Sequence, residues 1–175
     1  MKKLIVLLVF VAAGYKLYDM NFSETEVLPF YIESEKFAFS ASFPKKPEYK
    51  YKEVDHPDFG PIGIEVFGVK KNGAIYTVQG IKYLAEDFDA PDTLEDAVEA
   101  FNQSIEDKYD LIKTEFTSVN SVPAVLLMHE ERRADNKSKV LITLKDGLSV
   151  QMMVFYEPES ALVADKYIES LQIIN

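Results

Sequence analysis

Two dipeptides constrain the fold of this chain more than any other feature, because each one predicts a tight β-hairpin. Asn72-Gly73 and Asp146-Gly147 stand between runs in which apolar and polar residues alternate. Asn-Gly and Asp-Gly tolerate the positive φ angles of a two-residue type I′ loop, which joins adjacent antiparallel strands. Each loop also fixes the register of its two strands. The expected cross-strand pairs are Phe67 with Val78, Val69 with Tyr76, Thr143 with Val150 and Leu141 with Met152.

The other strands are predicted from the same alternation of side chains. Phe37, Phe39, Ala41 and Phe43 recur at every second position, and Pro44 ends the run. Residues 49–54 alternate more weakly, as is typical of an edge strand. The full set of expected strands is 37–43, 49–54, 62–70, 74–83, 111–119, 123–132, 138–145 and 148–156, with a turn at Asn120-Ser121.

Two helices are expected between and after these strands. The first should start with a cap at Asp92, with Glu95 three residues later as in a capping box, and should end near Lys108. The second should begin at Pro158, because proline suits the first turn of a helix. Their apolar stripes are Leu94, Ala97, Val98, Phe101 and Ile105 in the first helix, and Ala161, Ala164, Ile168 and Leu171 in the second.

The order of these elements is four strands, a helix, four strands and a helix, which predicts an α+β fold. Hairpin connections dominate, so the sheet should be largely antiparallel, with the mid-chain and C-terminal helices packed on it in an α/β/α sandwich-like arrangement. Residues 36–175 are expected to form a single domain, since no long Pro-, Gly- or Ser-rich linker divides them. Residues 19–35 are polar and aperiodic, and we interpret them as a tether or a segment that covers a sheet edge.

Residues 1–18 are interpreted as a signal peptide or an N-terminal anchor. Lys2 and Lys3 precede the apolar run 4–13, which is shorter than the ~20 residues of a membrane-spanning helix and matches a signal-peptide core. Cleavage after Ala13 and retention as an anchor are both open, and a buried N-terminal strand or helix is a third alternative. The lysines should stay on the cytoplasmic side. The domain is therefore expected to be exported, either periplasmic or anchored to the inner membrane and facing outward.

Composition excludes several classes of function. The formal net charge of −10 repels nucleic acid and anionic lipid headgroups. The isolated basic pairs are too few for a nucleic-acid surface, so we expect no nucleic-acid partner and contact with a membrane only through the N-terminal segment. The chain has no cysteine, which rules out disulfides, thiolate nucleophiles, cysteine–zinc sites and a lipoprotein anchor.

The candidate residues for catalysis or metal binding are few. His56 lies in an acidic turn-like stretch, and His129 lies on a predicted strand near carboxylates, where a surface ion pair is expected. The acidic run 86–96 does not fit the calcium-loop spacing and is explained more simply by the positive end of the helix dipole. Nucleophile and phosphate-binding motifs are missing. We therefore predict no enzyme activity and assign no catalytic residue, no metal-ligating residue and no cofactor.

The order and spacing of the elements over residues 36–174 resemble those of the PsbP-like superfamily. The features that carry the resemblance are the opening strand Phe39-Ser40-Ala41-Ser42-Phe43-Pro44, the long hairpin, the mid-chain helix, the turn at Asn120-Ser121-Val122-Pro123-Ala124, the loop Asp146-Gly147 and the ending Ile168-Glu169-Ser170-Leu171. This superfamily includes the photosystem II extrinsic subunit and small bacterial exported proteins. The resemblance implies a central antiparallel sheet with helices on both faces and a role in binding or assembly. No functional residue of the family maps onto this chain, and no residue supports a photosynthetic role.

The sequence thus favours a non-enzymatic, exported binding or assembly module, whose expected partner is another protein in the cell envelope. Two alternatives stay open. One is a hydrolase that uses carboxylates in a cleft, and the other is a carrier for an apolar small ligand. Close carboxylates with raised pKa values would favour the hydrolase, a deep dry cavity would favour the carrier, and an exposed apolar patch would favour a protein partner.

Overall fold

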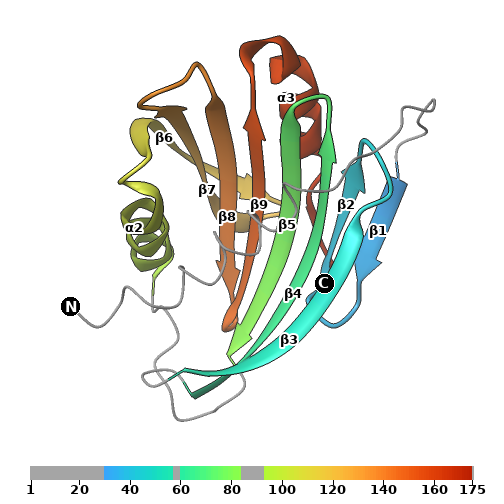
Figure 1. Ribbon diagram of the computed structural model, residues 1–175. Helices are drawn as coiled ribbons and strands as arrows, with labels where there is room; N and C mark the ends of the chain where they lie inside the picture. The colour runs from blue at the N-terminus through green and yellow to red at the C-terminus, as the bar shows by residue number, and fades with distance from the viewer. Residues whose placement is uncertain (1–29, 57–59, 84–92, 175) are drawn as a thin grey trace.

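The computed structural model describes residues 30–56, 60–83 and 93–174, and it has two antiparallel sheets with two helices (Figure 1). The larger sheet has seven strands in the order β3-β4-β5-β9-β8-β7-β6, and the smaller has three in the order β1-β2-β10. The elements are β1 (Phe30–Ser34), β2 (Phe39–Phe43), β3 (Glu48–His56), β4 (Gly60–Lys71), β5 (Ala74–Tyr83), α2 (Leu94–Ile105), β6 (Tyr109–Val119), β7 (Val122–Glu131), β8 (Lys137–Lys145), β9 (Leu148–Tyr156), the 3₁₀ turn η2 (Pro158–Ser160), α3 (Ala161–Glu169) and β10 (Gln172–Ile173).

The two predicted type I′ hairpins are confirmed. Asn72 and Gly73 have φ angles of 49° and 78°, and Asp146 and Gly147 have φ angles of 50° and 71°. All four cross-strand pairs expected from these loops occur in the observed registers of β4 with β5 and of β8 with β9. The third turn, Asn120-Ser121, adopts the same positive φ angles without a glycine.

Each face of the larger sheet is covered by a helix, which confirms the predicted α+β fold (Figure 1). On one face α3 and the three-stranded sheet bury a core that includes Phe39, Phe43 and Tyr167 against Tyr76 and Met152. On the opposite face α2 packs over β7 and β8. There its buried residues Ala97, Phe101 and Ile105 contact the cluster formed by Val125, Leu127, Val140, Ile142 and Met153.

Residues 19–35 were interpreted as a tether or a segment that covers a sheet edge, and their C-terminal end fits the second interpretation, because Phe30–Ser34 forms strand β1 along one edge of β2. This strand pairs with β2 along its whole length, with Ile32 opposite Ala41. The C-terminal strand β10 was not expected either, and it pairs with the other edge of β2. Neither strand carries a clear alternation of its own. β1 has five residues and is largely exposed, and β10 has only two residues and pairs with a strand that is distant in the sequence. Residues 1–29, including the predicted signal or anchor, lie outside the described residues.

The helix boundaries differ from the prediction by a few residues. Thr93, rather than Asp92, is the N-cap of α2, and its hydroxyl accepts a hydrogen bond from the Asp96 backbone N–H at 3.2 Å. Asp92 itself lies outside the described residues. Pro158 begins a 3₁₀ turn that leads into α3. No helix in the described ranges is long and apolar enough to cross a membrane.

Candidate functional site

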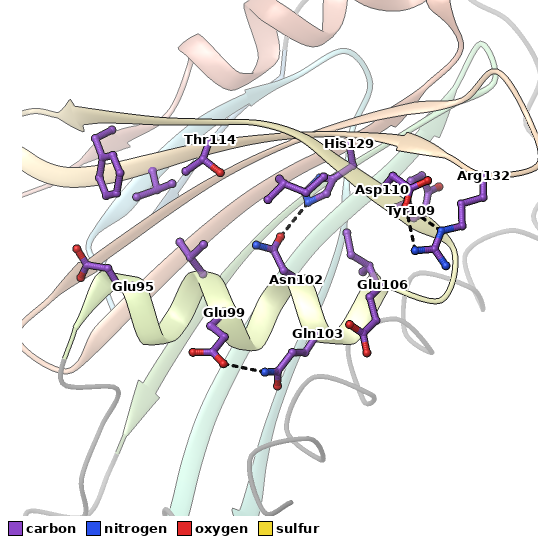
Figure 2. A pocket seen from close by; sticks show the side chains of 15 residues that line it. Glu95, Glu99, Asn102, Gln103, Glu106, Tyr109, Asp110, Thr114, His129 and Arg132 are labelled. Carbon is purple, nitrogen blue, oxygen red and sulfur yellow. Dashed lines mark hydrogen bonds and ion pairs between the residues drawn. The ribbon is translucent and has the colours of Figure 1, made fainter.

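A groove of about 440 Å³ runs between α2 and the edge strand β6. Figure 2 shows α2 along one side and β6 along the other, with His129 of β7 between them. Apolar side chains form much of its lining, and the helix contributes a polar rim. Its lining includes Val98 and Asn102 from α2, Leu111, Thr114 and Phe116 from β6, and His129 from β7.

The groove exists because α2 does not reach the last strand of the sheet. The apolar stripe of α2 is buried over β7, β8 and β9, against residues such as Val125 and Met153. Beyond this contact β6 continues the sheet as its outermost strand and pairs, within the described part of the chain, only with β7. The flank of the helix and the projecting strand therefore form two walls with solvent between them.

Strand β6 is unusually apolar for an exposed edge. All residues from Asp110 to Ser118 are exposed. Among them Phe116 is 69% exposed, Ile112 58% and Leu111 46%. The register places Phe116 opposite Val125 and Thr114 opposite Leu127, on the face of the sheet that α2 covers. An apolar patch beside an open strand edge is typical of a surface that another chain covers.

His129 forms part of the floor of the groove and is held neutral there. Only 2% of the residue is exposed, and this burial lowers its pKa to about 4. Its Nε2 lies 3.0 Å from Oδ1 of Asn102, and its Nδ1 lies 3.0 Å from Oγ of Ser138. Since Oδ1 can only accept, Nε2 donates to Asn102 and Nδ1 accepts from the Ser138 hydroxyl. The predicted surface ion pair is therefore wrong, because the α2 stripe buries this part of β7.

The rim of the groove is acidic. Glu95, Glu99 and Glu106 lie along α2 and its C-terminal cap, and all three are exposed. The only cation in the groove lining is Arg132, which forms an ion pair of 2.9 Å with Asp110. α2 has no basic residue in its last turn, and an acid at a helix C-terminus opposes the helix dipole. Glu95, in the first turn, favours the dipole, whereas Glu106 at the C-cap opposes it, and together the three carboxylates give this flank a negative field.

This arrangement offers little for catalysis. Both ring nitrogens of His129 are hydrogen-bonded, and the rim carboxylates are exposed to water. His56 ends β3 opposite Gly60, and four strands of the larger sheet separate β3 from β7, so the two histidines are not brought together. Over the described ranges no three His, Asp or Glu side chains gather as a metal site would require. Of the acidic run 86–96, residues 86–92 lie outside the described residues, and Glu95 and Asp96 occupy the first turn of α2.

The sequence did not reveal this groove, although two signals were present. Leu111 and Ile112 are adjacent apolar residues in a strand, and the structure has an irregularity in the register between Leu111 and Lys113. The second signal is that the helix Leu94–Ile105 contains acids but no lysine or arginine. Neither signal was sufficient, because a sequence pattern does not show that a strand lies at the edge of the sheet or that one side of a helix borders a groove.

Comparisons with known proteins identify the fold alone. No family model matches the chain, and no curated protein matches it. The solution structure of cyanobacterial PsbP (CyanoP) from Synechocystis is similar with a TM-score of 0.56 and 11% sequence identity, over 89% of this chain and 97% of that one. A protein of unknown function from Pseudomonas aeruginosa also matches, with a TM-score of 0.42 and 10% identity over 81% of this chain and 91% of its own. The chain therefore has a PsbP-like fold.

Proposed function

We propose that the chain is a non-enzymatic binding module of an exported compartment and that a partner protein occupies the groove between α2 and β6. The observation that carries this proposal is the exposed apolar surface of β6, where Phe116 is 69% exposed beside the groove. Burying such a side chain contributes on the order of 2 kcal/mol to association. Large exposed aromatic side chains next to a concave surface are also the usual anchors of protein interfaces.

The two alternative functions fit this site less well. A carboxylate hydrolase needs an acid and a base with separated pKa values, whereas the rim carboxylates stand in water and the floor histidine is neutral with both nitrogens occupied. A carrier must enclose most of the surface of its ligand. The groove instead has walls whose apolar residues Leu111 and Phe116 are open to solvent.

The second part of the proposal is export, and its support comes from the N-terminal sequence. Lys2 and Lys3 before the apolar run 4–13 support a signal peptide or an anchor. The likeness to PsbP-like proteins, whose relatives include small exported proteins, agrees with a binding or assembly role outside the cytoplasm. The expected partner is another protein of the cell envelope.

Affinity capture from the native cell envelope tests the proposal with two matched variants. Phe116→Ser removes the most exposed apolar side chain of β6, and Leu162→Ser removes a side chain of similar exposure, 68%, on α3 at the opposite face of the sheet. We expect Phe116→Ser to lose the captured protein and Leu162→Ser to retain it, with similar melting temperatures for both variants. Equal capture by the two variants would show that the groove is not the binding site.

A further inference from the structure

The backbone of β6 presents hydrogen-bonding groups that have no strand partner among the described residues, along the same edge that carries the groove. Val119 pairs with Val122 across the two-residue turn Asn120-Ser121, and such a turn closes on a hydrogen-bonded pair. Hydrogen-bonded and non-hydrogen-bonded pairs then alternate along an antiparallel ladder. The next pair is Ser118 with Pro123. It belongs to the non-hydrogen-bonded kind, which agrees with the missing N–H of proline.

Continuing this alternation identifies the residues whose N–H and C=O groups point away from β7. Phe116 opposite Val125 and Thr114 opposite Leu127 follow Ser118 at every second position. The opposite end of the strand gives the same alternation. There the Arg132 N–H donates to the Lys108 carbonyl at 3.0 Å, so the neighbouring pair of Tyr109 with Glu131 is of the non-hydrogen-bonded kind. Thr114, Phe116 and Ser118 therefore point both their backbone groups to the open edge, and their side chains lie on the face that α2 covers, where Thr114 and Phe116 line the groove.

Charged side chains often protect a strand edge from association, but those of β6, Lys113 and Glu115, lie on the face of the sheet away from α2. Lys113 and Glu115 pair with one another at 2.7 Å. Their partners in β7 are Met128 and Leu126, and Leu126 packs against the core on the side away from α2. Charges and irregularities are common means of blocking edge-to-edge association. Here they leave Thr114, Phe116 and Ser118 exposed on the opposite face, the one that α2 covers.

Charge decides between a second copy of this chain and a different partner. The groove is bordered by Glu95, Glu99 and Glu106, while its one cation, Arg132, is already paired with Asp110. A second copy would bring an identical acidic rim and a further formal charge of −10. Like charges that face one another across an interface disfavour association. The fitting occupant is a segment with basic side chains, whose aliphatic stems can cover apolar surface while their charged ends reach carboxylates.

We propose that an extended, lysine- or arginine-bearing segment of a partner protein adds to β6 as an eighth strand of the larger sheet. Backbone hydrogen bonds to Thr114, Phe116 and Ser118 hold the segment, and its alternate side chains enter the groove beneath the acidic rim of α2. This inference rests on the proposed function, because it specifies how the groove binds its partner and what the partner's chemistry is.

Two substitutions at one position separate strand addition from binding by side chains alone. Thr114→Pro removes an N–H that points to the open edge, so pairing with β7 and folding are expected to persist, since proline is tolerated on an edge strand. Thr114→Ala removes the side chain and keeps the N–H. The probe is a synthetic peptide of about ten residues that alternates arginine with valine, and its matched control carries glutamate in place of arginine. Binding to the full chain is followed by NMR shifts of the β6 amides.

We expect the arginine peptide to bind the wild-type protein and Thr114→Ala with similar affinity, and Thr114→Pro at least about tenfold more weakly. The glutamate peptide should not bind, and added salt should weaken the arginine peptide. Equal affinity of Thr114→Pro and the wild type, or equal binding of both peptides, would overturn the inference. Self-association of the protein that Thr114→Pro abolishes would also overturn it, because the occupant would then be a second copy. If Phe116→Ser loses the envelope partner while Thr114→Pro keeps it, the groove remains the binding site and only strand addition fails.

Discussion

Phe37 lies against the backbone of Gly80 so closely that a Cβ atom at Gly80 would stand 2.6 Å from Cδ1 of the phenylalanine. Phe37 precedes β2 of the smaller sheet and is completely buried, whereas Gly80 belongs to β5 in the larger sheet. The contact therefore joins the two sheets at a point where the larger one has no side chain. Glycine at this position creates the space that the aromatic ring fills.

Gly80→Ala should destabilise the protein because Phe37 has no room to retreat. Three atoms of Phe37, including its Cβ, lie within 2.7 Å of the position that a new Cβ would take. Inserting a methyl group into such packing costs about 1–3 kcal/mol. Urea unfolding measures the loss directly. The double variant Gly80→Ala with Phe37→Leu should lose less than the sum of the two single changes. Strict additivity of the two losses would contradict the proposed contact.

The hairpins were predictable because their information is local. Asn72-Gly73 and Asp146-Gly147 specify loop geometry within two residues, and the loop then sets the register of both strands. The helices were predictable for a similar reason, since the stripe of Ala97, Phe101 and Ile105 repeats within a few residues. The errors at their ends reflect single capping contacts, such as the one that Thr93 makes with Asp96.

The candidate site was not predictable because it depends on the order of strands in the sheet. Phe116 looks like a core residue in the sequence, and the same alternation would bury it in a central strand. It is exposed because the order β3-β4-β5-β9-β8-β7-β6 places β6 at an edge. That order follows from the pairing of β5 with β9, which no turn connects. The smaller sheet was missed for the same reason, since its strands β1 and β10 come together only through β2.

Gly147→Val should lower stability by on the order of 1 kcal/mol or more, because a β-branched residue is strained at the φ angle of 71° that this position adopts. No atom lies within 4 Å of the added Cβ, so the loss comes from the backbone alone. Gly147→Asn is the matched control, since asparagine tolerates this conformation. Thermal unfolding should rank glycine first, asparagine second and valine last. A melting temperature for the valine variant equal to that of the wild type would contradict the type I′ loop.

Acid should destabilise the fold through His129. Burial lowers the pKa of His129 from 6.5 to about 4 in the folded protein, so the unfolded chain takes up a proton at a higher pH than the folded one. The stabilising contribution is complete above pH 6.5 and is lost progressively as the pH falls toward 4. The loss should reach about 2 kcal/mol near pH 5. Urea unfolding at neutral and acidic pH measures it, with His129→Gln as the variant in which this part of the pH dependence disappears. The same pH dependence in both proteins would mean that other groups cause it.

Export should be visible in the N-terminus of the protein recovered from cells. Lys2 and Lys3 before the apolar run 4–13 direct the segment to the membrane. We expect the protein in the envelope fraction, either shortened near Ala13 or attached by an intact segment. Cell fractionation followed by mass spectrometry of the N-terminal peptide distinguishes these two outcomes. Protein with intact Met1 in the soluble cytoplasmic fraction would contradict the prediction.

Neither histidine should be needed for the chemistry of the protein's biological role. His56 ends an edge strand, and His129 is buried with both nitrogens engaged by Asn102 and Ser138. Truncation of His129 would leave the buried Ser138 hydroxyl and the half-buried Asn102 side chain without this partner, so His129→Ala is expected to cost about 2 kcal/mol. His129→Gln keeps a group that can hydrogen-bond and is the better test of function. His56→Ala and His129→Gln should each complement a deletion strain as well as the wild type does. Failure of His56→Ala at normal protein levels would favour an enzyme or a metal site over a binding module, because His56 lies on β3, away from the groove, whereas failure of His129→Gln would also follow from a changed groove floor.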